Sequence, residues 1–369
     1  MKAVVVTGVN EFGVEDLELL PPGPKEVRVD MKACGLCMSD HHVISGGLPT
    51  PLPCVLGHEG AGVIAEVGDQ VTQFQVGDHV VLNFSPACGT CVMCKRGLSN
   101  FCASHPLEQQ MAGVYTDGTT RHKRADGSAV QSFLGVGCMA EEAVVHQDCC
   151  VKADPSIDMK YACVVSCGVM TGAGASINTG QVRPGDTVAV FGCGGVGLNA
   201  IQGARIAGAP MVIAVDLSAN KLDLAKKLGA THMIKGDEED AVKKIHEITG
   251  GLGVDVAIEC VGIPPLIHQA YASTRPLGRT VTVGVPAPDK EIKLNAFELT
   301  ATGRCMCGHK AAGSGANSGQ FISSLLGQYQ AGNLDLDTLV SQTYKIEDVH
   351  KAVEDLLANA NARGVFVFD

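Results

Sequence analysis

The stretch from residue 187 to residue 216 decides the fold of this chain. It reads Thr187-Val-Ala-Val-Phe191, then Gly192-Cys193-Gly194-Gly195-Val196-Gly197, a helix-like run, and finally Val212-Ile-Ala-Val-Asp216. A short β-branched strand, three spaced glycines, a helix and a second strand predict a βαβ unit with a dinucleotide fingerprint. Gly192 allows a sharp turn, Gly194 lets the backbone approach a pyrophosphate, and Gly197 allows the helix to pack closely on the strand.

The same stretch predicts which dinucleotide is bound. Unpaired N–H groups and the helix dipole favour phosphate at the helix N-terminus. Asp216 ends the second strand, at the distance from the glycines where an acid accepts hydrogen bonds from the adenosine ribose. Its charge would repel a 2′-phosphate, so we expect NAD rather than NADP.

Composition limits the class of protein. A chain of 369 residues indicates two domains, and 46% hydrophobic residues suffice for a sizeable core. The net charge of −11 argues against nucleic acid or an anionic membrane as partner. Apolar runs fall short of the roughly 18–20 residues of a membrane-spanning helix. We expect a cytoplasmic protein.

The pattern along the chain indicates two kinds of architecture. Residues 1 to about 165 are rich in short β-branched segments, which predicts a mostly-β domain. Strands and helices alternate beyond the fingerprint, which predicts a doubly wound parallel sheet. The small basic run at residues 121–124 could bind an anion, but a solvated loop is the preferred interpretation. The main predicted elements are strands at 3–7, 26–34, 62–67, 78–84, 254–258, 280–283 and 364–368, and helices at 221–228 and 346–357.

Four cysteines form the most specific spacing in the chain. Cys88, Cys91, Cys94 and Cys102 give C-x2-C-x2-C-x7-C, and four thiolates this close satisfy a tetrahedral ion completely. We interpret them as a structural zinc site. An iron–sulfur cluster is the alternative, but a following Cys-Pro and a second cluster motif are both missing. Apart from these four and from Cys37 and Cys167, which are considered next, ten cysteines have no assigned role, and buried small hydrophobes are the default interpretation.

A second metal site is indicated by Cys37, His58 and Cys167. Each alone would be a packed or surface residue, but thiolates and imidazole suit zinc, and Glu59 adjoins His58. Three protein ligands with one open position are typical of catalytic zinc.

In their order and spacing, these motifs resemble the zinc-dependent medium-chain alcohol dehydrogenases, in particular a class III-like bacterial and actinobacterial branch. The resemblance covers essentially the whole chain. It implies a GroES-like catalytic domain at residues 1–168 and 311–369, with an NAD-binding Rossmann domain at 169–310 inserted. It also implies two Zn²⁺ per subunit, a homodimer, and reversible oxidation of a hydrophobic alcohol by NAD to the aldehyde.

The resemblance also implies roles for individual residues. Cys37, His58 and Cys167 match the catalytic zinc ligands. Glu59 matches a carboxylate near the metal, and Asp40 matches the acid that orients the zinc-bound histidine. Ser39 and His42 match a proton relay. The positions at which the family contacts its cofactor are occupied here by Thr171, Gly192, Gly194, Gly195, Val196, Gly197, Asp216, Lys221, Val285 and Arg363. The positions that line the family's substrate channel are occupied by Leu48, Phe84, Phe133, Leu134 and Val285.

Two departures from the family pattern matter. Met38 stands where many relatives place a basic residue on the pyrophosphate, which leaves cofactor affinity open. Gly46, Leu48 and Pro106 replace charged residues used for glutathione adducts, which argues against a glutathione-dependent activity. Other interpretations remain: oxidation of a formaldehyde adduct of another thiol such as mycothiol, an enzyme that retains and recycles NAD, and a non-enzymatic NAD-binding protein.

Overall fold

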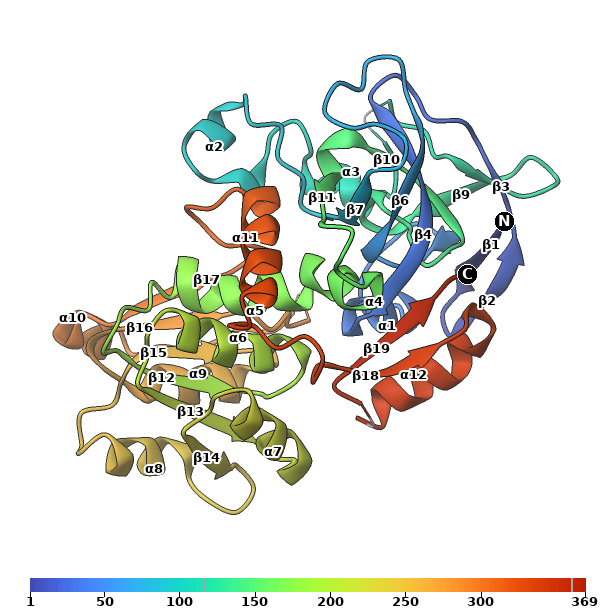
Figure 1. Ribbon diagram of the computed structural model, residues 1–369. Coiled ribbons are helices and arrows are strands. Elements are labelled where there is room, and N and C mark those ends of the chain that lie inside the picture. Colours follow the sequence, from blue (N-terminus) through green and yellow to red (C-terminus); the bar gives the residue numbers. More distant parts are fainter. Residues whose placement is uncertain (116, 288, 360) are drawn as a thin grey trace. The chain divides into compact units, whose positions relative to one another are not determined.

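The computed structural model describes residues 1–115, 117–287, 289–359 and 361–369. The chain divides into two compact units (Figure 1). Unit 1 comprises Met1–Cys167, Asn317–Gly332 and Leu336–Asp369, and unit 2 comprises Gly168–Ala316 and Asn333–Asp335. The chain therefore leaves unit 1 after Cys167 and returns to it near its C-terminus, so unit 1 is discontinuous in sequence.

Unit 1 is built on two sheets. Its larger sheet has seven strands, β4 (Glu26–Leu36), β6 (Glu59–Val67), β7 (His79–Leu82), β10 (Glu142–His146), β11 (Cys150–Lys152), β18 (Val340–Tyr344) and β19 (Arg363–Val367). They run in the order β11-β7-β6-β4-β19-β18, and β10 also pairs with β4. The second sheet contains β1 (Lys2–Gly8), β2 (Glu11–Asp16), β3 (Glu18–Leu19), β5 (Cys54–Val55), β8 (His122–Lys123) and β9 (Ala129–Ser132), in the order β2-β1-β5-β9-β8-β3.

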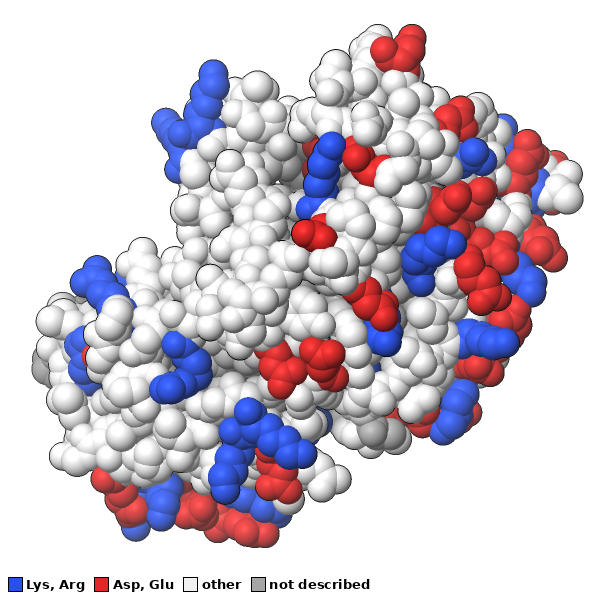
Figure 2. All heavy atoms as spheres, in the orientation of Figure 1, with Lys and Arg blue, Asp and Glu red and all other residues white. Residues whose placement is uncertain are grey.

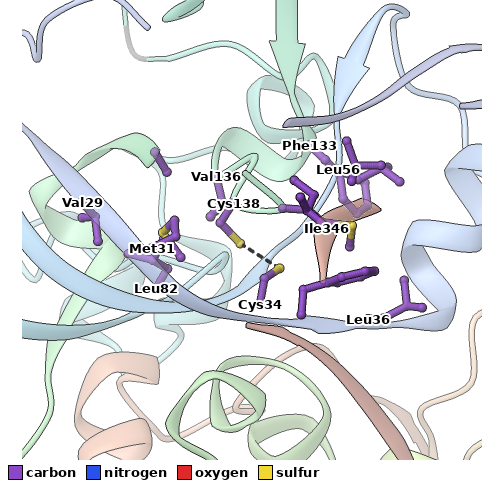
Figure 3. Close-up of a cluster of buried hydrophobic side chains, with 14 of the residues drawn as sticks. Val29, Met31, Cys34, Leu36, Leu56, Leu82, Phe133, Val136, Cys138 and Ile346 are labelled. Carbon is purple, nitrogen blue, oxygen red and sulfur yellow. Dashed lines mark hydrogen bonds between the residues drawn. The ribbon is translucent and has the colours of Figure 1, made fainter. Parts of the chain in front are cut away.

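Strand β4 organises the core of unit 1. Its side chains alternate across the sheet, as a strand requires, and Val27, Val29 and Met31 are buried. Figure 3 shows Val29, Met31 and Leu36 in one apolar cluster with Leu82, Phe133 and Val136. The buried thiols of Cys34 and Cys138 lie 3.6 Å apart within it. These two cysteines thus serve as small core residues, as expected for thiols outside the metal sites.

Among its described residues, unit 1 contains the α-helices α1 (Met38–Ile44), α2 (Val92–Lys95), α3 (Leu107–Met111), α4 (Met159–Ala162), α11 (Ser318–Gln330) and α12 (Val349–Leu357). Helix α12 buries Val349, Ala352 and Val353 in the same cluster as β4. This i, i+3, i+4 spacing is the apolar face of an amphipathic helix. The C-terminal segment is therefore integrated into unit 1 by both α12 and β19.

Unit 2 is a parallel sheet between helices. Its strands are β12 (Thr187–Phe191), β13 (Met211–Asp216), β14 (His232–Lys235), β15 (Val254–Glu259), β16 (Thr274–Thr282) and β17 (Cys305–Gly308). They lie in the order β14-β13-β12-β15-β16-β17, and all five pairings are parallel. The helices are α5 (Gly168–Gly174), α6 (Gly195–Ile206), α7 (Ala219–Lys227), α8 (Ala241–Ile248), α9 (Pro264–Ala272) and α10 (Ala296–Thr302). The predicted doubly wound sheet is confirmed.

The order of these strands reverses at β12. The chain first moves outward through β13 and β14, and then returns to the other side of β12 with β15. This reversal creates a switch point at the carboxyl end of β12, where open α/β sheets bind ligands. The glycine-rich turn at residues 192–197 lies at this end.

The predicted solvated loop at residues 121–124 is wrong. Arg121 is only 7% exposed, and its guanidinium donates to both carboxylate oxygens of Glu26 at 2.7 Å and to Asp117 at 2.8 Å. His122 is fully buried in β8. Arg121 thus neutralises the buried Glu26 rather than facing water, while Arg124 pairs with the partly exposed Glu15.

The charged surface is mixed in sign. On the face in Figure 2, Lys and Arg side chains lie among Asp and Glu side chains, with large uncharged areas between them. Exposed ion pairs such as Lys235–Asp237 and Lys351–Asp355 reflect this mixing.

Over the described residues, we find no single helix with the length and apolar character needed to cross a membrane. One bent pair of helical segments, Met159–Ser166 with Gly168–Thr179, passes that test on length and composition alone.

Candidate metal centres and cofactor site

Three neighbouring strands of unit 1 converge on one site. In the ladder, Gly35 of β4 is opposite Glu59 at the start of β6, and Leu36 is opposite Gly364 in β19. The chain then leaves β4 at Cys37, which precedes helix α1. Because β6 and β19 flank β4, residues 37, 58, 59 and 363 meet although they are far apart in sequence.

Cys167 completes this cluster. The candidate ligand atoms of Cys37, His58, Glu59 and Cys167 all lie within 4.8 Å of one another, and all four residues are buried. Two thiols and an imidazole are ligands suited to zinc. The site is therefore chemically and geometrically able to hold a zinc ion.

His58 provides a direct test of that fit. It is 1% exposed, and its Nε2 has no hydrogen-bond partner within the residues that the structure describes. Its Nδ1 lies 3.4 Å from Asp40 Oδ1. A buried imidazole nitrogen without a partner costs free energy, and a metal ion bound to it would remove that cost. The arrangement of metal, imidazole and carboxylate is the one that metal-binding histidines commonly have.

Asp40 is fixed by the start of α1. Its Oδ2 accepts the Cys37 amide and its Oδ1 accepts the Gly57 amide, both at 3.0 Å. The side chain is fully buried. Asp40 thus ties the segment that carries Cys37 to the segment that carries His58. Its role in orienting a metal-bound His58 stays a prediction.

Electrostatics favour a thiolate at Cys37. A hydrogen bond from Cys167 lowers the pKa of the Cys37 thiol, and His58 and Arg363 add to this effect against the opposing effect of burial. The thiolate is the form that ligates metals.

Glu59 is paired with Arg363 rather than turned outward. The guanidinium Nη2 donates to Glu59 Oε2, and both side chains are buried. Sequence reasoning placed these residues beside a metal and a pyrophosphate respectively, but it did not connect them. The pairing of β4 with both β6 and β19 is the missing information, since no local pattern relates positions 59 and 363.

Aromatic rings enclose His58. Phe84 and Phe133 both meet it edge-on, with ring centroids 5.5 and 5.3 Å away. Phe133 is fully buried, whereas Phe84, Leu48 and Leu134 are partly buried around the same core. Four of the predicted channel residues, Leu48, Phe84, Phe133 and Leu134, thus share one apolar cluster, whereas Val285 lies exposed in unit 2. The rings of Phe84 and Phe133 lie against the candidate zinc ligand His58. Leu134 also lines a separate small cavity beside His105.

The predicted relay residues lie on α1. Ser39 and His42 are one helical turn apart and partly buried, so they lie on the same helix face. Ser39 Oγ is 3.7 Å from Cys37 Sγ. A hydroxyl is therefore next to the candidate metal position.

The four cysteines at 88, 91, 94 and 102 form a second cluster. Their ligand atoms lie within 4.8 Å of one another. Backbone amides of Cys91, Cys94 and Cys88 each donate to a cysteine sulfur at 3.4 Å. Such bonds stabilise thiolates. Despite the opposing effect of partial burial, hydrogen bonds from Ser104, Thr90 and backbone amides lower the pKa of Cys88 to about 5. Four sulfurs fill a tetrahedral coordination sphere.

The glycine-rich turn predicted to bind a dinucleotide lies in unit 2, between β12 and α6. Gly192 has φ of +88°, a Cβ on Gly197 would lie 1.8 Å from the Gly192 carbonyl oxygen, and space beside Gly194 is open. The positive φ of Gly192 and the close packing at Gly197 account for those two glycines, while the contact of Gly194 with a pyrophosphate stays a prediction. Asp216 Oδ2 accepts the Cys193 amide at 2.7 Å, and Oδ1 accepts the Ser218 amide at 2.9 Å.

The remaining predicted cofactor residues also lie in unit 2, apart from Arg363. Thr171 is in α5, Val196 and Gly195 start α6, Lys221 is in α7, and Val285 follows β16 with 68% of its surface exposed.

The sequence reasoning missed Glu259, which ends β15, the strand that pairs with β12. Glu259 accepts the Val261 and Gly262 amides at 2.8 Å, and an acid at a strand end was the available indication.

A third cluster, His105, His146 and Asp148, was also missed. The His-x-Asp spacing at 146–148 was the only local indication, and it becomes informative only once the fold brings His105 beside it.

Comparison with known proteins identifies relatives of the whole chain. Residues 23–155 match the family described as alcohol dehydrogenase GroES-like domain, and residues 195–321 match zinc-binding dehydrogenase. Alcohol dehydrogenase B of Mycobacterium tuberculosis is 40% identical over 359 residues, which covers 96% of this chain and 94% of that protein.

Solved structures agree. An alcohol dehydrogenase zinc-binding domain protein from Burkholderia ambifaria is 34% identical, with a TM-score of 0.94, 100% of this chain covered and 98% of that one. Benzyl alcohol dehydrogenase from Acinetobacter calcoaceticus is 32% identical, with a TM-score of 0.93, 100% of this chain covered and 99% of that one.

Proposed function

The chain belongs to the zinc-dependent medium-chain alcohol dehydrogenase family and is an oxidoreductase, and from this we propose that it oxidises a hydrophobic primary alcohol, aliphatic or aromatic, to the aldehyde with NAD, reversibly. The observation that carries the proposal is the buried cluster of Cys37, His58 and Cys167 beside Glu59. Its ligand set matches three protein ligands with a position left for substrate.

Within this proposal, Cys37, His58 and Cys167 hold the catalytic zinc. Zinc bound there supplies a Lewis acid that lowers the pKa of an alcohol towards neutrality. Asp40 keeps His58 oriented, and the Glu59–Arg363 pair holds two opposite charges beside the ligands. Cys88, Cys91, Cys94 and Cys102 hold a second, structural zinc.

The proton of the alcohol leaves through Ser39. Its hydroxyl lies near Cys37, and His42 follows one turn later on the same helix. The Ser39 hydroxyl would accept the proton of the alcohol while it donates its own proton towards His42. The His42 imidazole would then release a proton to solvent. Substitution of either residue should slow turnover without removing zinc.

NAD is the expected hydride acceptor. The open space at Gly194 and the N-terminus of α6 suit a pyrophosphate. Asp216 at the end of β13 supports discrimination against a 2′-phosphate. We assign cofactor binding to the inserted domain predicted at residues 169–310, and catalysis to residues 1–168 and 311–369. A homodimer remains the expected assembly.

An apolar substrate follows from the rings at the metal site. Phe84 and Phe133 place hydrocarbon against His58, which suits a hydrophobic alcohol better than a charged thiol adduct. One relative of high structural similarity is a benzyl alcohol dehydrogenase. Apolar pockets separate close homologues poorly, so we expect a broad range that includes benzyl alcohol and hexanol.

The test is nicotinamide absorbance on mixing the zinc-loaded protein with NAD and benzyl alcohol or hexanol, with formaldehyde plus mycothiol in parallel. A rise with the simple alcohols supports the proposal. A rise only with the thiol mixture would replace it with adduct oxidation. Activity only with a second aldehyde present, from protein that carries nicotinamide after purification, would indicate retained NAD.

A further inference from the structure

His105, His146 and Asp148 form a compact side-chain cluster in unit 1, separate from both cysteine-containing sites. His105 lies in the loop between Cys102 and helix α3, His146 ends strand β10, and Asp148 lies in the turn that follows. Their side chains are 8%, 15% and 16% exposed. Three candidate ligands from two distant segments are thus held in a largely buried position.

The geometry of the cluster centres on one oxygen. Asp148 Oδ2 lies 2.9 Å from His105 Nε2 and 3.6 Å from His146 Nδ1. Two ligand atoms on a tetrahedral zinc with bonds of 2.0–2.1 Å are about 3.3 Å apart. The two observed separations lie on either side of this value, and all candidate ligand atoms fall within 4.8 Å. An ion could therefore be bound if the ligand atoms of His105 and His146, which lie no more than 4.8 Å apart, also close to about this separation.

His146 Nδ1 is unprotonated, which is the state in which an imidazole nitrogen binds a metal ion. The Asp148 amide donates a hydrogen bond to it at 3.1 Å, so this nitrogen carries a lone pair rather than a proton. A metal ion would compete with this amide for the lone pair. The rings of His105 and His146 pack edge to face, 5.0 Å apart between centroids.

A small cavity provides room for the rest of the coordination sphere. Its volume is about 30 Å³, and His105, His146, Tyr115 and Cys149 are among its lining residues. That is enough for a water molecule. Protein side chains thus supply three ligands, and water can reach both imidazoles.

We propose that His105, His146 and Asp148 form a third metal site, which takes a divalent transition-metal ion such as Zn²⁺ with water as a further ligand. Imidazole and carboxylate are ligands for this class of ion. The bound ion would link the loop that follows the four-cysteine cluster to the end of β10. It would therefore stabilise the attachment of that loop to the β core, and it takes no part in hydride transfer.

The alternative is that His105 and Asp148 form only a hydrogen-bonded pair, for which added metal should change nothing. Equilibrium dialysis of the purified, zinc-containing protein against ZnCl₂, followed by elemental analysis, separates the two. Asp148→Asn keeps the side-chain volume and the backbone amide but removes the charge, and His105→Gln removes a second ligand. His268→Gln, at an exposed histidine of unit 2, is the matched control for adventitious surface binding.

We expect the wild-type protein and the His268→Gln control to bind one zinc ion per chain more than Asp148→Asn or His105→Gln does. Binding of this ion should weaken at least about 10-fold in Asp148→Asn and in His105→Gln, the lower bound for disturbing a metal site. The proposal is overturned if the wild-type protein takes up no extra ion, or if either site variant binds it as tightly. The wild-type measurement needs no variant, so a variant that fails to fold leaves the test intact.

Discussion

Arg363 at the start of β19 donates a hydrogen bond to Glu59 at the start of β6, and this buried ion pair spans the strand that leads to Cys37. The guanidinium is 6% exposed and the carboxylate is fully buried. Burial raises the pKa of Glu59, while Arg363 opposes this effect. The ionised form of the Glu59 carboxylate therefore depends on its contact with Arg363.

Replacing Arg363 with methionine should destabilise unit 1 strongly. The change leaves the Glu59 carboxylate buried without its partner, and breaking a buried pair in this way costs about 3–5 kcal/mol. Urea-induced unfolding of zinc-containing protein measures the loss. The double variant Glu59→Gln/Arg363→Met is the control: it should recover part of the stability, because no charge is left unpaired. Equal losses in the single and double variants would contradict the buried-pair explanation.

Replacing Cys37 with alanine should remove one zinc ion and all turnover while the fold remains. The variant deletes one of three protein ligands, but the four-cysteine cluster is untouched. Zinc per chain should fall by one, with an unchanged circular dichroism spectrum. Cys260→Ala, a cysteine of unit 2 outside both clusters, should keep full zinc content. Normal activity in Cys37→Ala would exclude this residue from the catalytic site.

Replacing Cys94 with alanine should affect local folding rather than the catalytic site. Like Cys37→Ala, it should remove one zinc ion. Its main effect should be on the segment from residue 88 to 111, because a four-thiolate site contributes directly to folding. Limited proteolysis should cleave this segment faster than in the wild-type protein. An unchanged zinc content per chain would show that the cluster does not bind metal through Cys94.

Substitution of Asp216 should relax the choice of cofactor. Asp216→Asn removes the negative charge but keeps an oxygen for the Cys193 amide, whereas Asp216→Ala loses both. We expect Asp216→Asn to raise kcat/KM with NADP about tenfold, an effect of about 1.4 kcal/mol. Asp216→Ala should in addition weaken NAD binding, because the glycine turn loses its acceptor. Kinetics with both cofactors check this, and unchanged selectivity in both variants would remove Asp216 from cofactor discrimination.

Phe84 and Phe133 should respond differently to truncation. Phe133 is fully buried, so Phe133→Ala should cost about 3–5 kcal/mol of stability through the cavity that it leaves. Phe84 is only partly buried, so Phe84→Ala should change substrate preference at a smaller cost. Unfolding midpoints and kcat/KM for benzyl alcohol and hexanol compare the two. Equal stability losses would contradict the difference in burial.

The parts of the structure that follow from local sequence were predictable. The βαβ unit depends on glycines at 192, 194 and 197, whose spacing reflects steric needs within one short segment. The four-cysteine cluster is likewise local. Predicted strands such as 26–34 were correct in type but ended early, since β4 continues to Leu36. Pairing with β6 and β19 extends it, and propensity contains no information about such partners.

The parts that depend on distant strand pairing were not predictable. Arg121 looked solvent-facing because its partner, Glu26, lies 95 positions away. The Glu59–Arg363 pair requires β4 to lie between β6 and β19. The cluster of His105, His146 and Asp148 requires a loop to fold back on the end of β10. In each case single residues gave no indication until the fold supplied their neighbours.

The two cysteine-containing sites differ in how much chain must be present before each can form. The four-cysteine set is complete once residue 102 has been synthesised, and closing so short a loop costs little entropy. The other set is complete only when residue 167 has been made, because Cys37 and Cys167 are 130 positions apart in the sequence. During synthesis, the four-cysteine cluster can therefore bind its ion first, and the second site can bind an ion only later. Zinc starvation during synthesis should accordingly yield folded chains with one ion and no turnover.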